Sequence, residues 1–496
     1  MPNGPLNKSY PADAALVICS LVPYLVLTAA VLPLSQIIAE SVGLSTTALD
    51  VTISVSTAGY AVGTVLAVQF AVRLPARRML VLYEVMLTVS AVLAAWAPTG
   101  GVFIGAFIAE GLATSLLLIA AVPPLVTRWP ARKMPLTGGI MNLCIFGAVA
   151  VGPTIGAIQA SSGDWRPLFW GVACVAALAL VLSLLTFEDV PPADLSSPWD
   201  FVAIALAVVG SGAAFFGAGW LEATKVAGLV SLVPLLGGLA LIVILVVYQY
   251  TIGNPLMPVR ATATTAPVTG IFLALMASAA SFGIMELVLQ ALRTASSPLD
   301  TGLLFLPEFA AAIAVAALFG AVFKTRFMPL LALAGLPAIA ISAALLLTAV
   351  TGAGPLVAAG VGILGLGVAA SVSPGLFMAG FSLRSAELQR VFALIELLRA
   401  MTAFLVAPIL VYLASVLGTS QSAGIRYSLW ICLGIAVLGF AGGLALYLGG
   451  YRRLQTPDLE RWQAEGEPAW ESPPLLSRLR GQGRHELAER PHSHAR

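Results

Sequence analysis

The chain has 496 residues, of which 59% are apolar and only 10% are charged. Soluble domains carry about 25% charged residues, so this composition excludes an ordinary soluble protein and indicates a chain that lies largely in a lipid bilayer. The formal net charge of +2 and the lack of a basic stripe argue against nucleic acid as a partner. The four cysteines lie far apart in apolar runs and the three histidines fall within the last twelve residues, so we expect no metal site and no cofactor.

A helix that crosses a bilayer needs about 20 mostly apolar residues. Residues 1–13 are short and polar and are predicted to form a cytoplasmic N-terminus. The first apolar run is long enough to span the membrane, so we do not expect a cleaved signal peptide. An N-terminal six-helix bundle is predicted for 14–187, with helices at 14–38, 52–71, 79–97, 102–125, 136–160 and 167–187.

A break rich in Pro and Asp follows this bundle, and 188–199 is predicted to be a cytoplasmic linker. Two additional transmembrane helices are predicted within 200–250, at 200–221 and 227–250. Residues 451–496 mix charges, Pro and Trp without a sustained apolar face, and are predicted to form a cytoplasmic, largely disordered tail. A C-terminal six-helix bundle is predicted for 251–450, with helices at 265–291, 301–323, 328–350, 354–380, 391–417 and 426–449.

The predicted spans indicate an all-α integral membrane protein with 14 transmembrane helices, arranged as two six-helix bundles plus two extra central helices. Two such halves are typical of transporters built from internal repeats. If the N-terminus is cytoplasmic, eleven Arg and Lys residues fall in the cytoplasmic loops and four in the opposite loops. This bias predicts that both termini are cytoplasmic, and the short loops and the Ala-, Gly- and Pro-rich composition favour the inner (plasma) membrane of a bacterium.

The fifth predicted span contains the sequence GAVAVGPTIGA, with Gly147, Gly152, Pro153 and Gly156. Small residues recur every four positions at 148, 152, 156 and 160, so they form one smooth helix face that a neighbouring backbone can approach closely. Pro153 removes a backbone hydrogen bond and permits a bend. Such a helix is suited either to tight packing or to a movement between conformations.

This span, followed by Asp164-Trp165-Arg166, resembles the antiporter motif of the major facilitator superfamily. Over about 14–450 the chain is similar to the fourteen-helix drug:proton antiporters of that superfamily. The resemblance implies the major facilitator fold and a conformational role for the four motif residues. Phe107 stands where the family has an arginine in the fourth helix, so the chain is identified as a divergent member.

The loop after the second predicted helix keeps Arg73, Arg77 and Arg78 of a family motif but lacks its aspartate, which is Val72 here. In the family this loop forms a charge relay that latches the cytoplasmic side. Glu84 lies about one turn into the next helix, so a latch of the three arginines with Glu84 is predicted. Alternatively, the arginines only fix the topology.

Carboxylates within a membrane are costly, so they face a cavity, pair with another group or stay protonated. Glu110, Glu286 and Glu308 lie inside predicted spans and are the candidates for proton coupling. For Glu110 the alternative is a structural hydrogen bond to a neighbouring helix, and for Glu308 it is a structural role. Glu286 lies about a turn from the outer end of its helix, where water can reach it, and is a candidate for either a substrate or a proton site.

Four other polar residues are candidates for the substrate pocket. Glu396 and Arg399 are three residues apart and share a helix face, so they either neutralise each other or contact the substrate. Asn142 either joins two helices by a hydrogen bond or binds the substrate, and Gln290 fits the family pattern at the end of the ninth helix.

These features predict a proton-coupled efflux transporter for multiple drugs or other lipophilic compounds, which works by alternating access. The expected partners are protons, a lipophilic or cationic small molecule and membrane lipid, and the chain is expected to be monomeric and not an enzyme. One alternative is a proton-coupled importer or facilitator of a small metabolite. Another is a membrane protein that descends from a transporter and no longer transports.

Overall fold

The computed structural model describes residues 5–6, 8–186, 198–293, 296–349, 354–450 and 454–477. These residues contain 14 helices that are long and apolar enough to cross a membrane. Their β-structure is one isolated bridge between Thr264 and Pro474. The all-α membrane fold predicted from the sequence is therefore confirmed. The predicted linker 188–199 lies largely outside the described residues. Residues 1–4 of the predicted N-terminus and 478–496 of the predicted tail also lie outside them.

The first six spans form one half of the molecule. The fifth of them is divided by a π-helical turn, and a short 3₁₀ turn precedes it. The elements are α1 (Tyr10–Val42), α2 (Thr46–Arg73), α3 (Ala76–Trp96), α4 (Gly100–Thr127), η1 (Ala131–Lys133), α5 (Met134–Asn142), the π turn η2 (Leu143–Gly147), α6 (Ala148–Ser161) and α7 (Arg166–Thr186).

Two central helices and six further spans follow, and the tenth span begins with a separate short helix. The elements are α8 (Phe201–Thr224), α9 (Leu229–Thr251), α10 (Thr265–Arg293), α11 (Pro298–Leu303), α12 (Leu306–Val322), α13 (Met328–Ala349), α14 (Gly354–Phe381), η3 (Ser385–Glu387), α15 (Leu388–Val416), α16 (Gln421–Gly449) and α17 (Leu459–Ala464).

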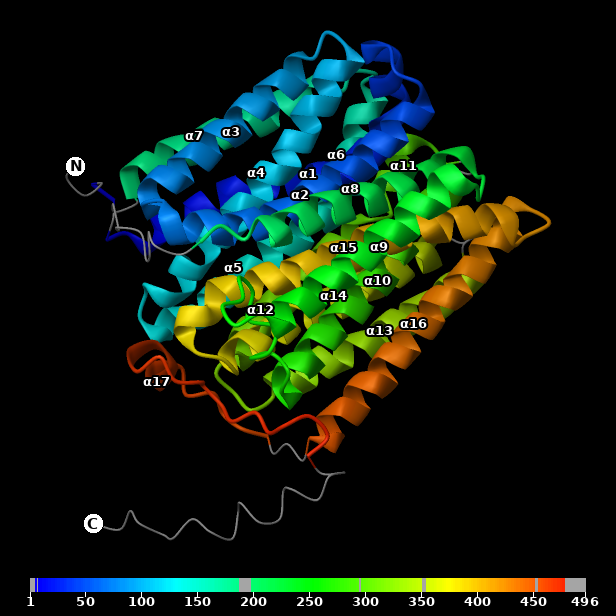
Figure 1. Cartoon of the computed structure of the whole chain (residues 1–496). Helices are drawn as coiled ribbons and strands as arrows, with labels where there is room; N and C mark the ends of the chain where they lie inside the picture. The colour runs from blue at the N-terminus through cyan, green and yellow to red at the C-terminus, as the bar shows by residue number, and fades with distance from the viewer. Residues whose placement is uncertain are drawn as a thin grey trace, which may run out of the picture.

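Figure 1 shows the two halves packed side by side, with α1 to α7 in one and α10 to α16 in the other. Helix α8 contacts both halves, through α2 and α15, and α9 packs against α8. Because successive spans alternate in direction, α1 begins and α16 ends at the same end of the bundle. We call this end the terminal end and the opposite one the distal end.

The small-residue face of α6 packs against α1. A Cβ atom added at Gly156 would lie 2.3 Å from the backbone oxygen of Ala30, and one at Gly152 would lie 2.7 Å from the Cβ of Ala29. Real Cβ atoms do not approach other atoms so closely, so glycine is required here for the two backbones to meet. The close-packed face predicted from the small-residue repeat is thus confirmed.

The predicted disorder of 451–496 is wrong for residues 454–477. This segment contains α17 and packs across the terminal end of the bundle (Figure 1). Trp462 and Trp470 are 0% and 4% exposed, so two large aromatic side chains bury enough surface to order a segment that has no periodic apolar pattern. Residues 451–453 and 478–496 lie outside the described part of the chain.

Most helices extend beyond their predicted bounds, and two of these extensions matter for the site. Helix α2 begins at Thr46 rather than 52, because the Ser45 side chain caps it by accepting a hydrogen bond from the Ala48 N–H at 3.1 Å. Helix α8 continues to Thr224 rather than 221. These additional turns place two carboxylates, Asp50 and Glu222, on helices instead of in loops.

Candidate functional site

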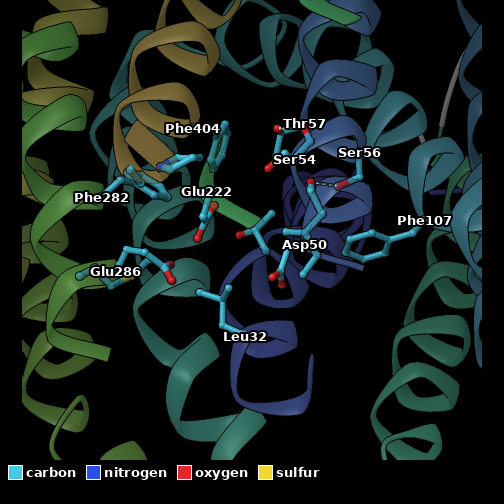
Figure 2. Close-up of a pocket in the computed structure, with 15 residues that line it drawn as sticks. Leu32, Asp50, Ser54, Ser56, Thr57, Phe107, Glu222, Phe282, Glu286 and Phe404 are labelled. Carbon is cyan, nitrogen blue, oxygen red and sulfur yellow. Dashed lines mark hydrogen bonds between the residues drawn. The ribbon is translucent and has the colours of Figure 1, made fainter. Parts of the chain in front are cut away.

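A cavity lies between the two halves, from the middle of the bundle toward its distal end (Figure 2). It encloses about 700 Å³, including the part that is open to solvent, and its walls come from α1, α2, α4, α8, α10 and α15. Both halves and one central helix therefore contribute to a single candidate binding site.

Three carboxylates line this cavity. Asp50 comes from α2, Glu222 from α8 and Glu286 from α10, and Figure 2 shows all three directed toward the same space. Among the described residues, no group of three or more His, Cys, Asp or Glu side chains is placed to hold a metal ion. The three carboxylates therefore face one common space from three different helices.

Glu222 reaches the cavity because α8 packs very closely on α2. A Cβ atom at Gly219 would lie 2.7 Å from the Cβ of Ser54 and 3.2 Å from the Cα of Val51. The missing side chain at Gly219 lets the two helices approach at this level. Glu222, three residues later in α8, then lies one turn beyond the contact, beside Asp50 at the start of α2.

Two cations lie within electrostatic range of the carboxylates, namely Lys225 and Arg293. Both are exposed, and the Arg293 guanidinium donates a hydrogen bond to the backbone oxygen of Leu32 at 2.6 Å. Three acids and two screened bases leave the local charge negative when all five groups are ionised. Electrostatic complementarity therefore favours a positively charged ligand.

Aromatic and apolar groups complete the walls of the cavity. Phe107, Phe282 and Phe404 line it together with hydroxyl-bearing residues such as Ser56 and Thr57. The rings of Phe282 and Phe404 have their centroids 5.0 Å apart at an angle of 73°. Aromatic faces bind both apolar surface and organic cations, so these walls suit a lipophilic ligand with a positive charge.

A buried ionic cluster lies below the cavity, toward the terminal end. Arg399 donates hydrogen bonds to Glu396 Oε2 from Nε at 2.9 Å and from Nη2 at 2.6 Å, and Nη2 also donates to the Tyr60 hydroxyl at 3.2 Å. The Tyr60 hydroxyl donates to Glu396 Oε2 at 3.1 Å. Because Tyr60 is on α2 and the other two are on α15, the cluster joins the two halves beneath the cavity.

A sequence comparison identifies the family. The family model of the Major Facilitator Superfamily matches residues 16–285, which is more than half of the chain. The chain belongs to this superfamily of membrane transporters. Among solved structures, the transporter resembles a POT family transporter in complex with 5-aminolevulinic acid, with a TM-score of 0.63 and 14% identity over 89% of this chain and 97% of that one. It also resembles the human organic anion transporter MFSD10 (TETRAN), with a TM-score of 0.55 and 14% identity over 87% of this chain and 99% of that one.

Curated relatives of the transporter come from bacteria. It is 26% identical over 210 residues to the lincomycin resistance protein LmrB of Bacillus subtilis (strain 168), which is 40% of this chain and 42% of that one. It is 29% identical over 175 residues to the LmrB of Listeria monocytogenes serovar 1/2a, which is 34% of this chain and 36% of that one. The transporter thus spans less than half the length of these curated relatives.

The three predicted proton-coupling residues lie in different surroundings. Glu286 lines the cavity. Glu110 is fully buried on α4, and neither of its carboxylate oxygens has a hydrogen-bond partner in the described part of the transporter. Glu308 is 4% exposed at the start of α12, where it packs against Gly365 of α14 and its Oε2 also lacks a described partner. The structure therefore brings only Glu286 to the cavity.

None of the four predicted pocket residues lines the cavity. Glu396 and Arg399 form the buried pair described above, which confirms the alternative that they neutralise each other. Asn142 donates a hydrogen bond to the backbone oxygen of Ala369 on α14 at 3.1 Å, so it joins the two halves. Gln290 near the end of α10 has a buried Oε1 without a partner among the described residues.

The three loop arginines remain near the terminal end but have separate contacts. Arg73 donates to the Gln69 side chain at 2.8 Å and lies 4.3 Å from the ring centroid of Trp199. Arg77 donates to a backbone oxygen near the end of α7 at 2.9 Å, and Arg78 is exposed. Arg73 thus ties α2 to the beginning of α8.

The predicted pairing of Glu84 with this loop is wrong. Glu84 is 0% exposed and its carboxylate accepts a hydrogen bond from the Ser20 hydroxyl on α1. The side chain at this position of α3 points into the first half rather than toward the loop. The position of Glu84 along α3 indicates how far it lies from the helix end. Which group it contacts depends on how α3 is rotated about its axis.

Sequence reasoning missed Asp50 and Glu222, which contribute two of the three carboxylates in the cavity. Both positions fell just outside the predicted spans. The Ser45-Thr46-Thr47 sequence is a helix start signal that could have placed Asp50 in the second helix. No comparable signal marks Glu222, because its role depends on the contact between α8 and α2.

Proposed function

We propose that this protein is an efflux transporter that moves a lipophilic cation outward in exchange for protons, by alternating access. The observation that carries the proposal is the cavity with Asp50, Glu222 and Glu286 among phenylalanine side chains (Figure 2). A lipophilic cation would place its charge near the carboxylates and its apolar surface against the rings. The bacterial relatives named for lincomycin resistance support export of an antibiotic-like compound.

Exchange follows from competition for the same carboxylates. A proton that binds Glu222 or Glu286 removes the negative charge that attracts the cation, so the two ligands exclude each other. A transporter that opens alternately to each side can then bind protons on one side and the cation on the other. In this scheme the cavity carboxylates carry out the coupling directly.

Glu110 and Glu308 are the second component of the proposed coupling. A charged carboxylate that is buried without a hydrogen-bond partner is costly, so both are accommodated as neutral acids in this conformation. A movement that exposes either side chain to water would permit release of its proton. Glu110 lies one turn from Phe107, which lines the cavity, so it is the nearer of the two to the proposed site along its own helix.

The test is a flux measurement in proteoliposomes that contain a pH-sensitive dye. A proton gradient is imposed, and tetraphenylphosphonium, ethidium, lincomycin and a panel of neutral amphiphiles are added in turn. We expect the cations to cause proton movement that is lost in Glu222→Gln and Glu286→Gln. Loss in Glu110→Gln as well would assign a part of the coupling to α4, and loss in Glu308→Gln would assign it to α12.

Two outcomes would contradict the proposal. If small polar metabolites, and not lipophilic cations, cause proton movement, and the protons move in the same direction as the metabolite, the protein is an importer. If protein of confirmed fold gives no coupled flux and no binding with any compound, the exchanger mechanism is wrong and a non-transporting role is favoured.

A further inference from the structure

Residues 454–477, which we call the strap, cross the terminal end of the bundle. We infer that the strap is a conformational latch, which holds the two halves together at this end and must release its Gln463 before the end can open. The inference rests on the alternating access of the proposed function, but not on its substrate or its proton coupling.

The strap is fixed to the second half by its two tryptophans. Trp462 donates a hydrogen bond from Nε1 to the backbone oxygen of Leu383 at 2.9 Å, and its ring lies 5.0 Å from that of Phe381. Trp470 donates from Nε1 to the Ser382 hydroxyl at 2.5 Å. All three partners lie at the end of α14 or directly after it, so the strap moves with the second half.

A second attachment lies near the other end of the strap, at the start of α10. The Thr265 N–H donates to the backbone oxygen of Pro473 at 3.0 Å, and the Ser472 hydroxyl contacts that of Thr264 at 2.9 Å. Thr264 and Pro474 form the isolated bridge. With attachments at both α10 and α14, the strap has a defined position on the second half.

One side chain of the strap crosses to the first half. The Gln463 side-chain amide donates one hydrogen bond to the backbone oxygen of Thr127 at 2.6 Å and another to that of Trp129 at 2.7 Å. Thr127 is the last residue of α4, and the last carbonyls of a helix have no partner within it. The two amide hydrogens of Gln463 therefore bond the last residue of α4 and the turn that follows it, both in the opposite half.

The acceptor on the first half is itself held in place. Trp129 donates from Nε1 to Asp13 Oδ2 at 2.9 Å and packs edge-on against Tyr10 with ring centroids 5.6 Å apart. The α4–η1 turn is thus tied to the beginning of α1. Because each side of the contact is fixed to its own half, the halves cannot separate at the terminal end while Gln463 keeps both hydrogen bonds.

The strap acts beside another contact between the halves at this end. Gln389, near the start of α15, donates to the backbone oxygen of Ile119 on α4 at 3.0 Å. That contact belongs to the transmembrane helices, whereas Gln463 belongs to a segment beyond the last span. The strap therefore adds a separate element that can control opening of the terminal end without altering the cavity.

The inference is tested by the distance between spin labels on the full-length protein in nanodiscs. Labels are placed at Arg132→Cys and Lys324→Cys, which are exposed positions on opposite halves at the terminal end, in a Cys174→Ser background. We expect Gln463→Ala to increase the ratio of open to closed molecules by about fivefold or more, because it removes two hydrogen bonds. Gln463→Glu should increase it at least as much, since a carboxylate faces two carbonyl oxygens.

The matched control is Gln455→Ala. Gln455 also lies in the strap, but among the described residues its side chain bonds to the backbone of Glu471, which is part of the strap as well. If the distances of Gln463→Ala and Gln463→Glu match those of Gln455→Ala and of the unaltered chain, the inference is overturned. The distance measurement needs no transported compound, so failure of the flux experiment above would leave this result unaffected.

Discussion

Glu222 lies in the last turn of α8. A substitution that removes only its charge distinguishes the electrostatic contribution to ligand binding from the apolar contribution. Glu222→Gln preserves the shape of the side chain and its ability to form hydrogen bonds. We expect about tenfold weaker binding of a monovalent lipophilic cation, because a contact with a charged group contributes about 1.5–3 kcal/mol. A neutral compound of similar size should change less than about twofold. Calorimetric titration of the purified protein measures both affinities.

The matched control for this substitution is Glu40→Gln. Glu40 is exposed near the distal end of α1, where it accepts a hydrogen bond from Gln36 at 3.0 Å and lies outside the cavity. Equal losses for the cation and the neutral compound in Glu222→Gln, or an equal loss in Glu40→Gln, would show that Glu222 does not bind the charge.

The buried pair of Glu396 and Arg399 makes a prediction about stability. Arg399 is 1% exposed, so Glu396→Gln leaves a buried guanidinium without its counter-charge. We expect a loss of about 3–5 kcal/mol, seen as a lower midpoint of thermal unfolding in detergent. Tyr60→Phe removes one hydroxyl from the same cluster and should cost about 1 kcal/mol.

The surface pair of Arg461 and Glu465 provides the comparison. Its side chains are 56% and 63% exposed with a contact of 3.1 Å, so Glu465→Gln should change stability by less than about 1 kcal/mol. A midpoint for Glu396→Gln that matches that of Glu465→Gln would indicate that water reaches the buried cluster.

The surroundings of single residues were harder to predict from the sequence than the helices themselves. The sequence indicated that Glu110, Glu286 and Glu308 lie inside spans, but whether a carboxylate faces a cavity depends on how a helix is rotated and on what packs beside it. Asp50 shows the other cause of error, since it is in the second turn of α2 and an apolar-run criterion excluded that turn. The first and last turns of membrane helices are often polar, so a criterion based on apolar runs does not detect them although they are helical.

Helix α8 offers a test of packing between elements. A Cβ atom at Gly219 would meet Ser54 on α2 at 2.7 Å, whereas one at Gly212 in the same helix has no atom within 4 Å. We expect Gly219→Ala to move the end of α8 away from α2, and so to weaken cation binding at Glu222 by about threefold or more, a change of at least about 0.6 kcal/mol. Gly212→Ala should leave binding unchanged and slightly stabilise the helix. Comparison of the two affinities with those of Glu222→Gln checks this, and equal affinities for the two glycine variants would contradict it.

The number of elements and their order were predictable from the sequence. All 14 spans were anticipated, because each long apolar run has few alternatives to a membrane helix. The order of six, two and six followed from their spacing. The strap was not anticipated, since two tryptophans separated by polar residues have no period that a sequence pattern can detect, and their partners lie far away in the chain.

At the scale of the whole molecule, the halves are joined at both ends, and the contacts at each end should have opposite effects. Arg293 on α10 bonds the backbone of Leu32 on α1 at 2.6 Å, at the distal end. We expect Arg293→Ala to favour opening of that end, by about fivefold in the ratio of open to closed molecules. The measurement uses spin labels at Gly101→Cys and Thr419→Cys, which are exposed at the distal end.

Gln463→Ala is the natural comparison in this experiment. It should lengthen the distance between labels at the terminal end and not at the distal end, while Arg293→Ala should do the reverse. Lengthening at both ends in either variant would indicate general loosening of the bundle instead of alternating access. The sequence could not predict these contacts, because each is a side chain bonded to a backbone oxygen of a helix in the opposite half.

The π turn at Leu143–Gly147 has a consequence for how the fifth span can vary. A π turn accommodates one residue more than an α-helical turn, and each residue of an α-helix corresponds to a rotation of about 100°. Deletion of one residue there would restore a regular helix and leave Gly152 and Gly156 facing α1, whereas deletion of a residue from a regular turn before them would rotate them by about 100° away from α1. Among homologous chains, a difference of one residue in the length of this span should therefore fall at this turn, with the glycine spacing after it unchanged.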